Sequence, residues 1–130
     1  MTTAWTESIT FDCDGTNIVT NLCHLGAQDG RPVLALHGFT GSGADFAALA
    51  DAAPEPLQLL APDLPGHGAY EAPPDLAQFG FEAARAVVRE ARLSAGWERS
   101  VLVGYSMGAR LALDVVLHRP AEVSALVLIS

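Results

Sequence analysis

The chain has 130 residues and a formal net charge of −8, and all seven of its basic side chains are arginines. A surface this acidic repels the phosphate backbone of nucleic acids and anionic membranes, so we expect neither as a partner. Because 50% of the residues are hydrophobic, the composition predicts one packed globular domain and excludes a disordered chain.

The N-terminus and the two cysteines bear on where the protein resides. The sequence holds no apolar run of about 18 residues, which a membrane-spanning helix would need, and its N-terminus lacks the basic and apolar regions of a signal peptide. These features predict a cytoplasmic protein. Cys13 and Cys23 could in principle pair, but in such a compartment we expect them to stay reduced and to pack as small hydrophobic side chains.

Residues 5–25 carry the pattern of an antiparallel strand pair. Ile9 and Phe11 alternate with polar residues, an Asp-Gly pair at 14–15 marks a turn, and a strand-like pattern resumes after it. We expect this hairpin to contribute packing rather than chemistry.

A glycine-rich loop, residues 37–43, follows a second apolar run at 33–36. The loop could cradle a phosphate, but its spacing fits neither of the nucleotide-binding glycine motifs and the chain has no lysine. We favour a loop that aims the backbone N–H of Phe39 toward the reaction centre considered below. His37 is either a general base or a residue that holds the loop by hydrogen bonds, and together with Gly38 we assign it the second, structural role.

A short helix and a third strand come next. Ser42 followed by Asp45 resembles a capping box, which predicts a short helix there. The apolar run 57–61 predicts a buried strand, and a loop stiffened by prolines follows it. Within that loop Asp63 and His67 could form half of an acid–base pair, but we favour a role in loop architecture.

Residues 79–94 show the periodicity of an amphipathic helix. One face is apolar and is expected to be buried; its members are Phe81, Ala84, Val88 and Ala91. Another face carries Arg85, Arg89 and Arg92. These arginines could recruit an acidic partner, but a face exposed to solvent is the interpretation we favour.

Residues 104–108 read Gly-Tyr-Ser-Met-Gly and lie between an apolar run at 101–103 and a helical pattern. On a strand–turn–helix junction this Gly-X-Ser-X-Gly pattern is the nucleophile elbow, whose sharp turn strains the backbone of Ser106 and raises its hydroxyl above the sheet. Gly104 and Gly108 lack Cβ atoms and so allow strand and helix to approach closely. The helix N-terminus adds free N–H groups and the positive end of the helix dipole.

The helix after Ser106 is apolar over most of its circumference, which predicts deep burial. The residues concerned are Leu111, Leu113, Val115, Val116 and Leu117. Arg110 on this helix either pairs with Asp114 one turn away or serves as the local cation for a substrate carboxylate. His118 lies about 18 Å along the helix from Ser106, too far to act as its base, and we interpret it as part of the helix C-terminus.

An apolar run at 123–129 predicts a last strand. Strands and helices alternate after the antiparallel start, which predicts an α/β fold with a mostly parallel sheet and helices on both faces. An apolar strand at the edge of that sheet would be an aggregation hazard, so we expect self-association through 123–129.

Three motifs follow one another in the order and spacing of the α/β-hydrolase superfamily, which this chain resembles over nearly its whole length. They are Leu-His-Gly-Phe at 36–39, Asp-Leu-Pro-Gly-His-Gly at 63–68 and Gly-Tyr-Ser-Met-Gly at 104–108. Residues 36–42 and 104–113 are most similar to a narrower family, the 2-succinyl-6-hydroxy-2,4-cyclohexadiene-1-carboxylate synthases of menaquinone biosynthesis, which eliminate pyruvate from their substrate.

The resemblance implies a mechanism and a set of site residues. Ser106 would supply the reactive oxygen, as a base in the synthases or as a nucleophile in esterases, activated by a histidine that an acidic residue orients. The backbone N–H groups of Phe39 and Met107 would form the oxyanion hole. Arg110 and Tyr105 would bind a small anionic substrate, and no metal or organic cofactor would be needed.

The same resemblance places the acid and the histidine after the serine in chain order. The residues that follow Ser106 offer neither at a suitable place. We therefore expect 1–130 to be the N-terminal part of a single α/β-hydrolase domain, truncated after about the sixth strand. Three functions stay open: a synthase of this type, a serine hydrolase acting on an ester or amide, and a non-catalytic fragment completed by a partner chain.

Overall fold

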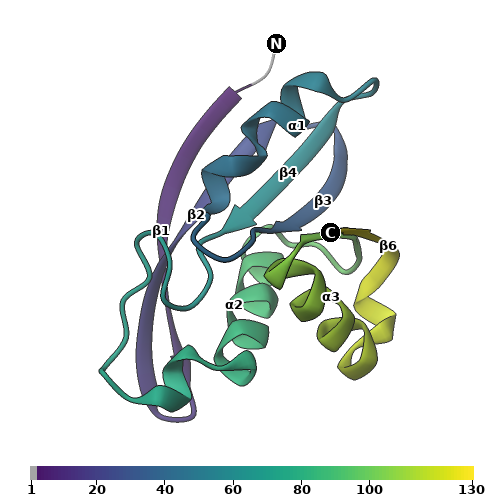
Figure 1. Ribbon diagram of the computed structural model, residues 1–130. Coiled ribbons are helices and arrows are strands. Elements are labelled where there is room, and N and C mark those ends of the chain that lie inside the picture. The colour runs from purple at the N-terminus through teal and green to yellow at the C-terminus, as the bar shows by residue number, and fades with distance from the viewer. Residues whose placement is uncertain (1–2) are drawn as a thin grey trace.

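One mixed sheet of six strands organises the chain, of which the computed structural model describes residues 3–130 (Figure 1). The strand order is β1-β2-β4-β3-β5-β6. The strands are β1 (Thr3–Cys13), β2 (Thr16–Gly26), β3 (Arg31–Leu36), β4 (Leu57–Pro62), β5 (Ser100–Tyr105) and β6 (Val123–Ile129). The helices are α1 (Ala47–Ala52), α2 (Phe81–Ser94) and α3 (Met107–His118), with short 3₁₀ helices η1 (Gly43–Phe46), η2 (Leu76–Phe79) and η3 (Pro120–Glu122).

The predicted N-terminal hairpin is confirmed. β1 and β2 pair antiparallel along their whole length, and both turn residues, Asp14 and Gly15, have positive φ angles, 50° and 81°. A turn with two left-handed residues matches the right-handed twist of paired strands. The two cysteines of this hairpin, Cys13 and Cys23, are free as expected, and burial raises the pKa of both thiols, which keeps them protonated.

The remaining strands β4, β3, β5 and β6 run parallel and form the centre and one edge of the sheet, which confirms the predicted α/β class. Leu34 of β3 lies opposite Leu60 of β4 on one side and Leu102 of β5 on the other. Because the carboxyl ends of parallel strands meet at the same edge, the loops after β3, β4 and β5 converge there. Open α/β sheets bind their ligands at that edge.

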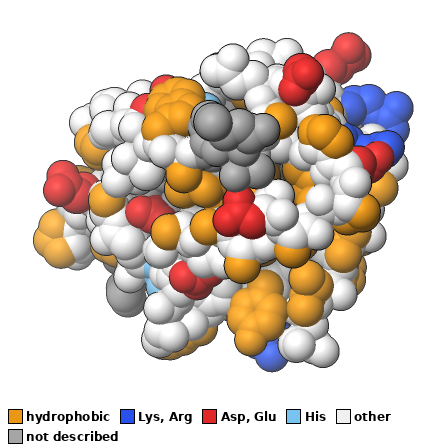
Figure 2. Space-filling model, turned by 90° about the horizontal axis from the view of Figure 1, so that it is seen from above, with side chains coloured by type: hydrophobic (Ala, Val, Ile, Leu, Met, Phe, Trp, Pro, Cys, Tyr) orange, Lys and Arg blue, Asp and Glu red, His pale blue; other side chains and the backbone are white. Residues whose placement is uncertain are grey.

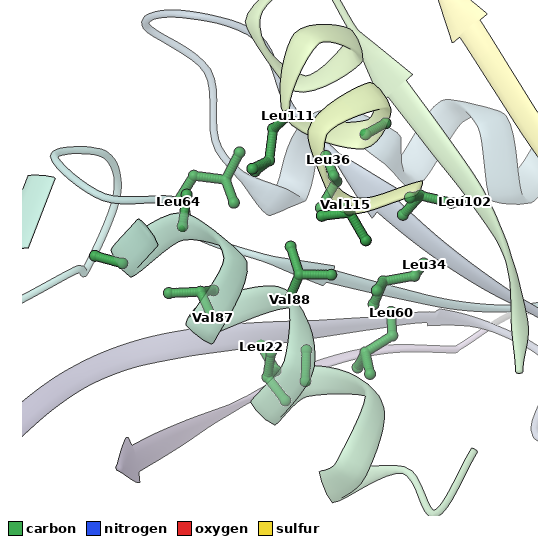
Figure 3. Close-up of a cluster of buried hydrophobic side chains, with 14 of the residues drawn as sticks. Leu22, Leu34, Leu36, Leu60, Leu64, Val87, Val88, Leu102, Leu111 and Val115 are labelled. Atoms are coloured by element: carbon green, nitrogen blue, oxygen red, sulfur yellow. The ribbon is translucent and has the colours of Figure 1, made fainter. Parts of the chain in front are cut away.

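The helices divide between the two faces of the sheet (Figure 1). α1 covers a smaller cluster on one face, and η1 before it begins as predicted, with the Ser42 N–H donating to the Asp45 carboxylate at 3.2 Å. α2 and α3 pack on the other face, where their apolar side chains point toward those of the strands (Figure 3). The labelled members of that cluster are Leu22, Leu34, Leu36, Leu60, Leu64, Val87, Val88, Leu102, Leu111 and Val115.

The buried face of α2 is not quite the predicted one. Phe81 was expected in the core but is 43% exposed, because it is the first residue of the helix. Smaller side chains pack against the sheet instead. The buried apolar residues of α2 are Ala83, Ala84, Val87, Val88 and Ala91.

The arginines of α2 do not form one solvated face, so that prediction is wrong. Arg92 is only 9% exposed; its guanidinium donates to the Trp97 carbonyl at 2.8 Å and pairs with Glu122 at 3.1 Å. Arg85 is half-buried against α3, and Arg89 is exposed. The long aliphatic stem of arginine can cover apolar surface while its charged end finds a partner, which helical periodicity alone does not reveal.

The prediction that α3 is buried over most of its circumference is also wrong. Leu111 and Val115 are 2% and 5% exposed, whereas Leu113 and Leu117 are 45% and 81% exposed. The sheet and α2 cover one side of the helix. Within residues 3–130 its other side faces solvent.

β6 forms an edge of the sheet, as predicted, and pairs with β5 alone in the described part of the chain. Val127, Leu128 and Ile129 are 44%, 44% and 41% exposed. Continuous apolar strands are typical of sheet interiors, so this edge is unusual for its composition.

The surface carries the acidic character of the sequence. Figure 2 shows acidic side chains scattered among apolar ones over one face, with arginines only near the rim of that view. An anionic ligand therefore needs a cation placed beside its own binding site. Among residues 3–130, no helix is long and apolar enough to cross a membrane.

Candidate active site

Ser106 occupies the turn between β5 and α3 and directly precedes the first helical residue. Its backbone has φ 51° and ψ −111°, a region that residues other than glycine rarely adopt. Its N–H donates to the Ile129 carbonyl at 2.8 Å, and its carbonyl accepts from the Ala109 N–H at 2.9 Å. The strained backbone that the elbow pattern predicts is present, and hydrogen bonds to β6 and α3 hold it in place.

The two glycines of the elbow lie where no side chain fits. A Cβ on Gly104 would lie 2.3 Å from the Gly108 carbonyl oxygen. A Cβ on Gly108 would lie 2.1 Å from the Leu36 carbonyl oxygen. The predicted close approach is therefore confirmed, and it presses the first turn of α3 against the end of β3, where the glycine-rich loop begins.

That loop starts with a tight turn, closed by a hydrogen bond from the Gly41 N–H to the Gly38 carbonyl at 3.0 Å. Thr40, the third residue of the turn, has φ 66°, whereas Phe39 before it is not left-handed, which is the type II pattern. Glycine usually fills this position, and a β-branched residue there is strained. Thr40 was not predicted from the sequence, since Gly-Phe-Thr-Gly places no glycine where the turn needs one.

His37 holds the start of the loop from within the core. Its ring is 1% exposed; Nε2 accepts a hydrogen bond from the Leu64 N–H at 3.0 Å, and Nδ1 lies 2.8 Å from the Gly38 carbonyl. Because an N–H can only donate, Nε2 must be the acceptor and Nδ1 carries the proton. Burial lowers the pKa of His37, although the Gly38 carbonyl opposes that shift. Nε2 thus ties the loop after β4 to the loop after β3, and Nδ1 holds the start of the latter, in line with the structural role favoured from sequence.

Aromatic side chains flank the same loop. Phe39 is 65% exposed, and its ring meets the His67 ring edge to face, with centroids 5.6 Å apart. His67 in turn lies 5.0 Å from the ring of His37. A Cβ on Gly38 would lie 2.8 Å from the ring of Tyr105, itself 48% exposed. His67 of the loop after β4 thus contacts Phe39, whose N–H is the predicted oxyanion donor, and Tyr105 at the end of β5 packs against Gly38, the residue before it.

Asp63 and His67 do not act as a pair. The Asp63 carboxylate accepts hydrogen bonds from the N–H groups of Gly43 at 2.9 Å and Ala69 at 3.0 Å. The His67 Nδ1 lies 3.0 Å from the Pro65 carbonyl. Both residues build the loop after β4, as the favoured interpretation predicts.

The N-terminus of α3 brings N–H groups and a cation to the edge that carries Ser106. Met107 is the first helical residue, so its N–H has no partner within the helix. Helical side chains tilt toward the N-terminus, which directs Arg110, one turn after Ser106, to the same end. Arg110 is exposed, and Asp114 pairs with Arg85 at 2.5 Å instead of with Arg110. The intrahelical pair considered from the sequence does not form.

The remaining question is whether a histidine or a metal-binding cluster accompanies Ser106. His118 caps the far end of α3, with Nδ1 2.8 Å from the Asp114 carbonyl, as expected for the helix C-terminus. No histidine of the described residues hydrogen-bonds to Ser106. Nor do residues 3–130 gather three or more His, Cys, Asp or Glu side chains that could hold a metal ion. The site therefore offers a strained serine, backbone donors and a cation.

Known proteins are similar to this chain in sequence and in fold. A family model described as alpha/beta hydrolase fold matches residues 31–130. A serine hydrolase-like protein of Danio rerio is 34% identical over 104 residues, which cover 80% of this chain and 32% of that protein. A 2-succinyl-6-hydroxy-2,4-cyclohexadiene-1-carboxylate synthase of Serratia proteamaculans is 33% identical over 101 residues, which cover 78% of this chain and 38% of that protein. The crystal structure of epoxide hydrolase A from Mycobacterium thermoresistibile shares the fold, with a TM-score of 0.77 at 22% identity over 97% of this chain and 39% of that one.

The similarity covers most of this chain but only part of each relative. It covers most of the present chain, which spans about a third of the length of these curated relatives. The matched range 31–130 contains the loop after β3, the loop after β4 and the elbow.

Proposed function

This chain belongs to the alpha/beta hydrolase fold family, and from that premise we propose that it supplies the reactive serine of an enzyme, with Ser106 in that role. One observation carries the proposal. Ser106 is held at φ 51° between β5 and the N-terminus of α3, so its backbone is strained at the edge where such sheets bind ligands.

The oxyanion hole would consist of the backbone N–H groups of Phe39 and Met107. The first lies in the strained turn after β3, and the second begins α3, where the helix dipole also favours negative charge. Loss of one such donor typically costs about 2.7–4 kcal/mol of transition-state stabilisation. The contacts of His37 and His67 fix the loop in advance and so reduce the reorganisation that catalysis would require.

The substrate we propose is a small anion bound by Arg110 and Tyr105. The exposed, unpaired guanidinium of Arg110 supplies the local attraction that a chain of net charge −8 otherwise lacks. In the specific reaction, elimination of pyruvate from the menaquinone precursor, Ser106 would first give its hydroxyl proton to a histidine, and the resulting alkoxide would take a proton from a substrate carbon. The electron pair of that C–H bond would form a C=C bond as the C–O bond breaks, and pyruvate would leave as its enolate, which then takes up a proton. The relative of Serratia proteamaculans carries the name of this synthase.

A second candidate is a serine hydrolase, because the Danio rerio relative bears that name. Here the Ser106 oxygen would attack the carbonyl of an ester or amide and transfer its proton to a histidine. The leaving group would depart with that proton, and water would then release the acid from the acyl-enzyme.

For either reaction we propose that this chain forms the N-terminal part of a longer catalytic domain in the cytoplasm. The acid and the histidine would then follow the serine in the chain order of the family. The share of each relative that the chain spans, 32% and 38%, supports this proposal. The alternative to this proposal is the third function left open by the sequence, a non-catalytic fragment whose sheet a partner chain completes.

The test uses the polypeptide that extends these residues to the length of the relatives. Pyruvate release from the menaquinone precursor is measured beside turnover of a neutral ester and labelling by an organophosphonate. Pyruvate release supports the synthase, whereas ester turnover with a phosphonate adduct on Ser106 and no pyruvate supports the hydrolase. Ser106→Ala should lower either activity by at least about 10³-fold, and full activity in that variant contradicts both candidates.

A further inference from the structure

Two charged residues of α3, Arg110 and Asp114, lie one turn apart, a spacing that brings side chains together on a helix surface. They are nevertheless not paired. Asp114 Oδ2 accepts a hydrogen bond from Nη1 of Arg85 on α2 at 2.5 Å, and Asp114 Oδ1 lies 3.6 Å from Nδ1 of His118. Both carboxylate oxygens therefore face groups other than Arg110.

We propose that Arg85 is a positioning residue: by holding Asp114, it keeps the guanidinium of Arg110 free to bind an anionic substrate. The inference rests on the proposed function, in which Arg110 is the substrate cation and Arg85 touches no substrate. Under this proposal part of the substrate specificity depends on α2, a helix that lies outside the three sequence motifs of the family.

Burial explains why Asp114 pairs with Arg85. The side chains of Arg85 and Asp114 are only 29% and 21% exposed, so water competes little for their hydrogen bond and screens their attraction weakly. A pair with the exposed Arg110 would be screened by solvent. In addition, Val88 of α2 and Val115 of α3 belong to one buried cluster, which holds the two helices at the distance that the Arg85 pair requires.

Without Arg85, Asp114 would lose its strongest partner. His118 already lies beside its other carboxylate oxygen, and Arg110 is the replacement on the helix that always carries a positive charge. A helical pair at this spacing is formed about twice as often as it is broken. Arg110 would then be free about a third of the time, which weakens anion binding about threefold.

The test measures how fast phenylglyoxal, a dicarbonyl that reacts with unpaired guanidinium groups, modifies Arg110, followed by mass spectrometry of the peptide that contains it. We expect Arg85→Met to slow this modification about threefold. The double variant Arg85→Met/Asp114→Asn should restore the wild-type rate, because it removes the carboxylate that would capture Arg110. A merely structural role of Arg85 would not produce this rescue, since the double variant has also lost the ion pair between the helices.

Arg89→Met is the matched control. Arg89 and Arg85 line the same groove of about 550 Å³ between the hairpin, α2 and α3, but Arg89 does not contact Asp114. Its substitution removes one nearby positive charge and should leave the modification rate of Arg110 unchanged. The proposal is overturned if Arg85→Met leaves the rate unchanged, if Arg89→Met slows it equally, or if the double variant stays slow.

The catalytic consequence is measured separately in the longer polypeptide. Arg85→Met should raise KM for the anionic substrate about threefold with kcat unchanged, and should leave KM for a neutral ester unchanged. If phenylglyoxal reacts as expected but KM for the anion stays constant, the effect of Arg85 on Arg110 stands, and the role of Arg110 in substrate binding is what fails.

Discussion

Leu111 and Leu117 belong to the same helix, α3, yet the first is 2% exposed and the second 81%. Leu111 packs with the strands and α2 in the cluster of Figure 3. Leu117 lies on an exposed side of the helix, and β6 next to it also exposes apolar residues, among them Val127 and Leu128, each 44% exposed. We call the exposed side of α3 together with β6 the outer flank. Both parts of the outer flank expose apolar side chains, although α3 also exposes Arg110 and His118.

The two regions differ in what fixes the reactive serine. On the buried side of α3, which we call the inner side, the backbone of the helix contacts the backbone of β3: a Cβ on Gly108 would lie 2.1 Å from the Leu36 carbonyl oxygen. The outer flank contributes a hydrogen bond from β6, between the Ser106 N–H and the Ile129 carbonyl, while its side chains have neighbours on one side only. Substitutions of side chains should therefore destabilise the inner side strongly and the outer flank little.

The largest effect is expected from truncating the two leucines. Leu111→Ala leaves a cavity in the core and should lower the free energy of unfolding by about 2–5 kcal/mol. Leu117→Ala is the matched control on the outer flank and should change it by no more than about 0.5 kcal/mol. Urea denaturation of the two variants measures the difference. Equal losses would mean that Leu117 is covered in solution, and the contrast between the two sides of α3 would collapse.

A second substitution tests the backbone contact itself. Gly108→Ala pushes a methyl group into the end of β3 and should lower the free energy of unfolding by about 3 kcal/mol. Gly80→Ala adds the same methyl group where nothing lies within 4 Å, and should cost about 0.5 kcal/mol because it alters the residue before α2. Similar losses in both variants would show that the first turn of α3 can move away from β3.

These contrasts mark how far the sequence predicts the fold. The strands, the hairpin and the close approach of Gly104 and Gly108 follow from hydrophobic period and local sterics, and all are confirmed. The burial of Leu117 and the exposure of Arg92 were predicted wrongly from the same kind of pattern. Whether one side of a helix is covered depends on elements distant in the chain, and helical periodicity contains no information about them.

The site divides in the same way. The strained backbone of Ser106 could be predicted, since the elbow is one continuous stretch of sequence. The strain at Thr40 and the contact of His67 with Phe39 could not, because they depend on how separate loops meet. The pair between Arg85 and Asp114 joins two helices that a strand and two loops separate in the sequence, so no spacing of residues predicts it.

A smaller effect on the inner side should appear with pH. Burial lowers the pKa of His37 below its usual 6.5, so as pH falls through that value the unfolded chain takes up a proton that the folded chain refuses. The free energy of unfolding should therefore fall as the solution is acidified below about pH 6.5. His37→Gln keeps an acceptor for the Leu64 N–H but does not titrate, and should lose less stability between about pH 7.5 and 5.5 than the wild type. Parallel stability curves for the two proteins would contradict the role assigned to the buried ring.

The smallest effect on folding is expected at the edge of the outer flank. Val127→Lys places a charge on a half-exposed side chain of β6 and should change the free energy of unfolding by no more than about 0.5 kcal/mol. Its effect on association should be larger, because a charged edge strand resists pairing with another edge. In sedimentation velocity the wild-type chain should become heavier with increasing concentration, whereas Val127→Lys should remain monomeric.

The opposite edge of the sheet provides the control for this expectation. β1 alternates polar and apolar residues, and Thr10→Lys adds the same charge to an exposed position there. If association runs through β6, Thr10→Lys should associate like the wild type. If both variants are monomeric, net charge and not the β6 edge controls assembly. If the wild-type chain stays monomeric at every concentration, an apolar edge of this length is tolerated without association. The outer flank is an interface only if Val127→Lys loses association and Thr10→Lys does not. It would then differ from the inner side of α3 in function as well as in packing.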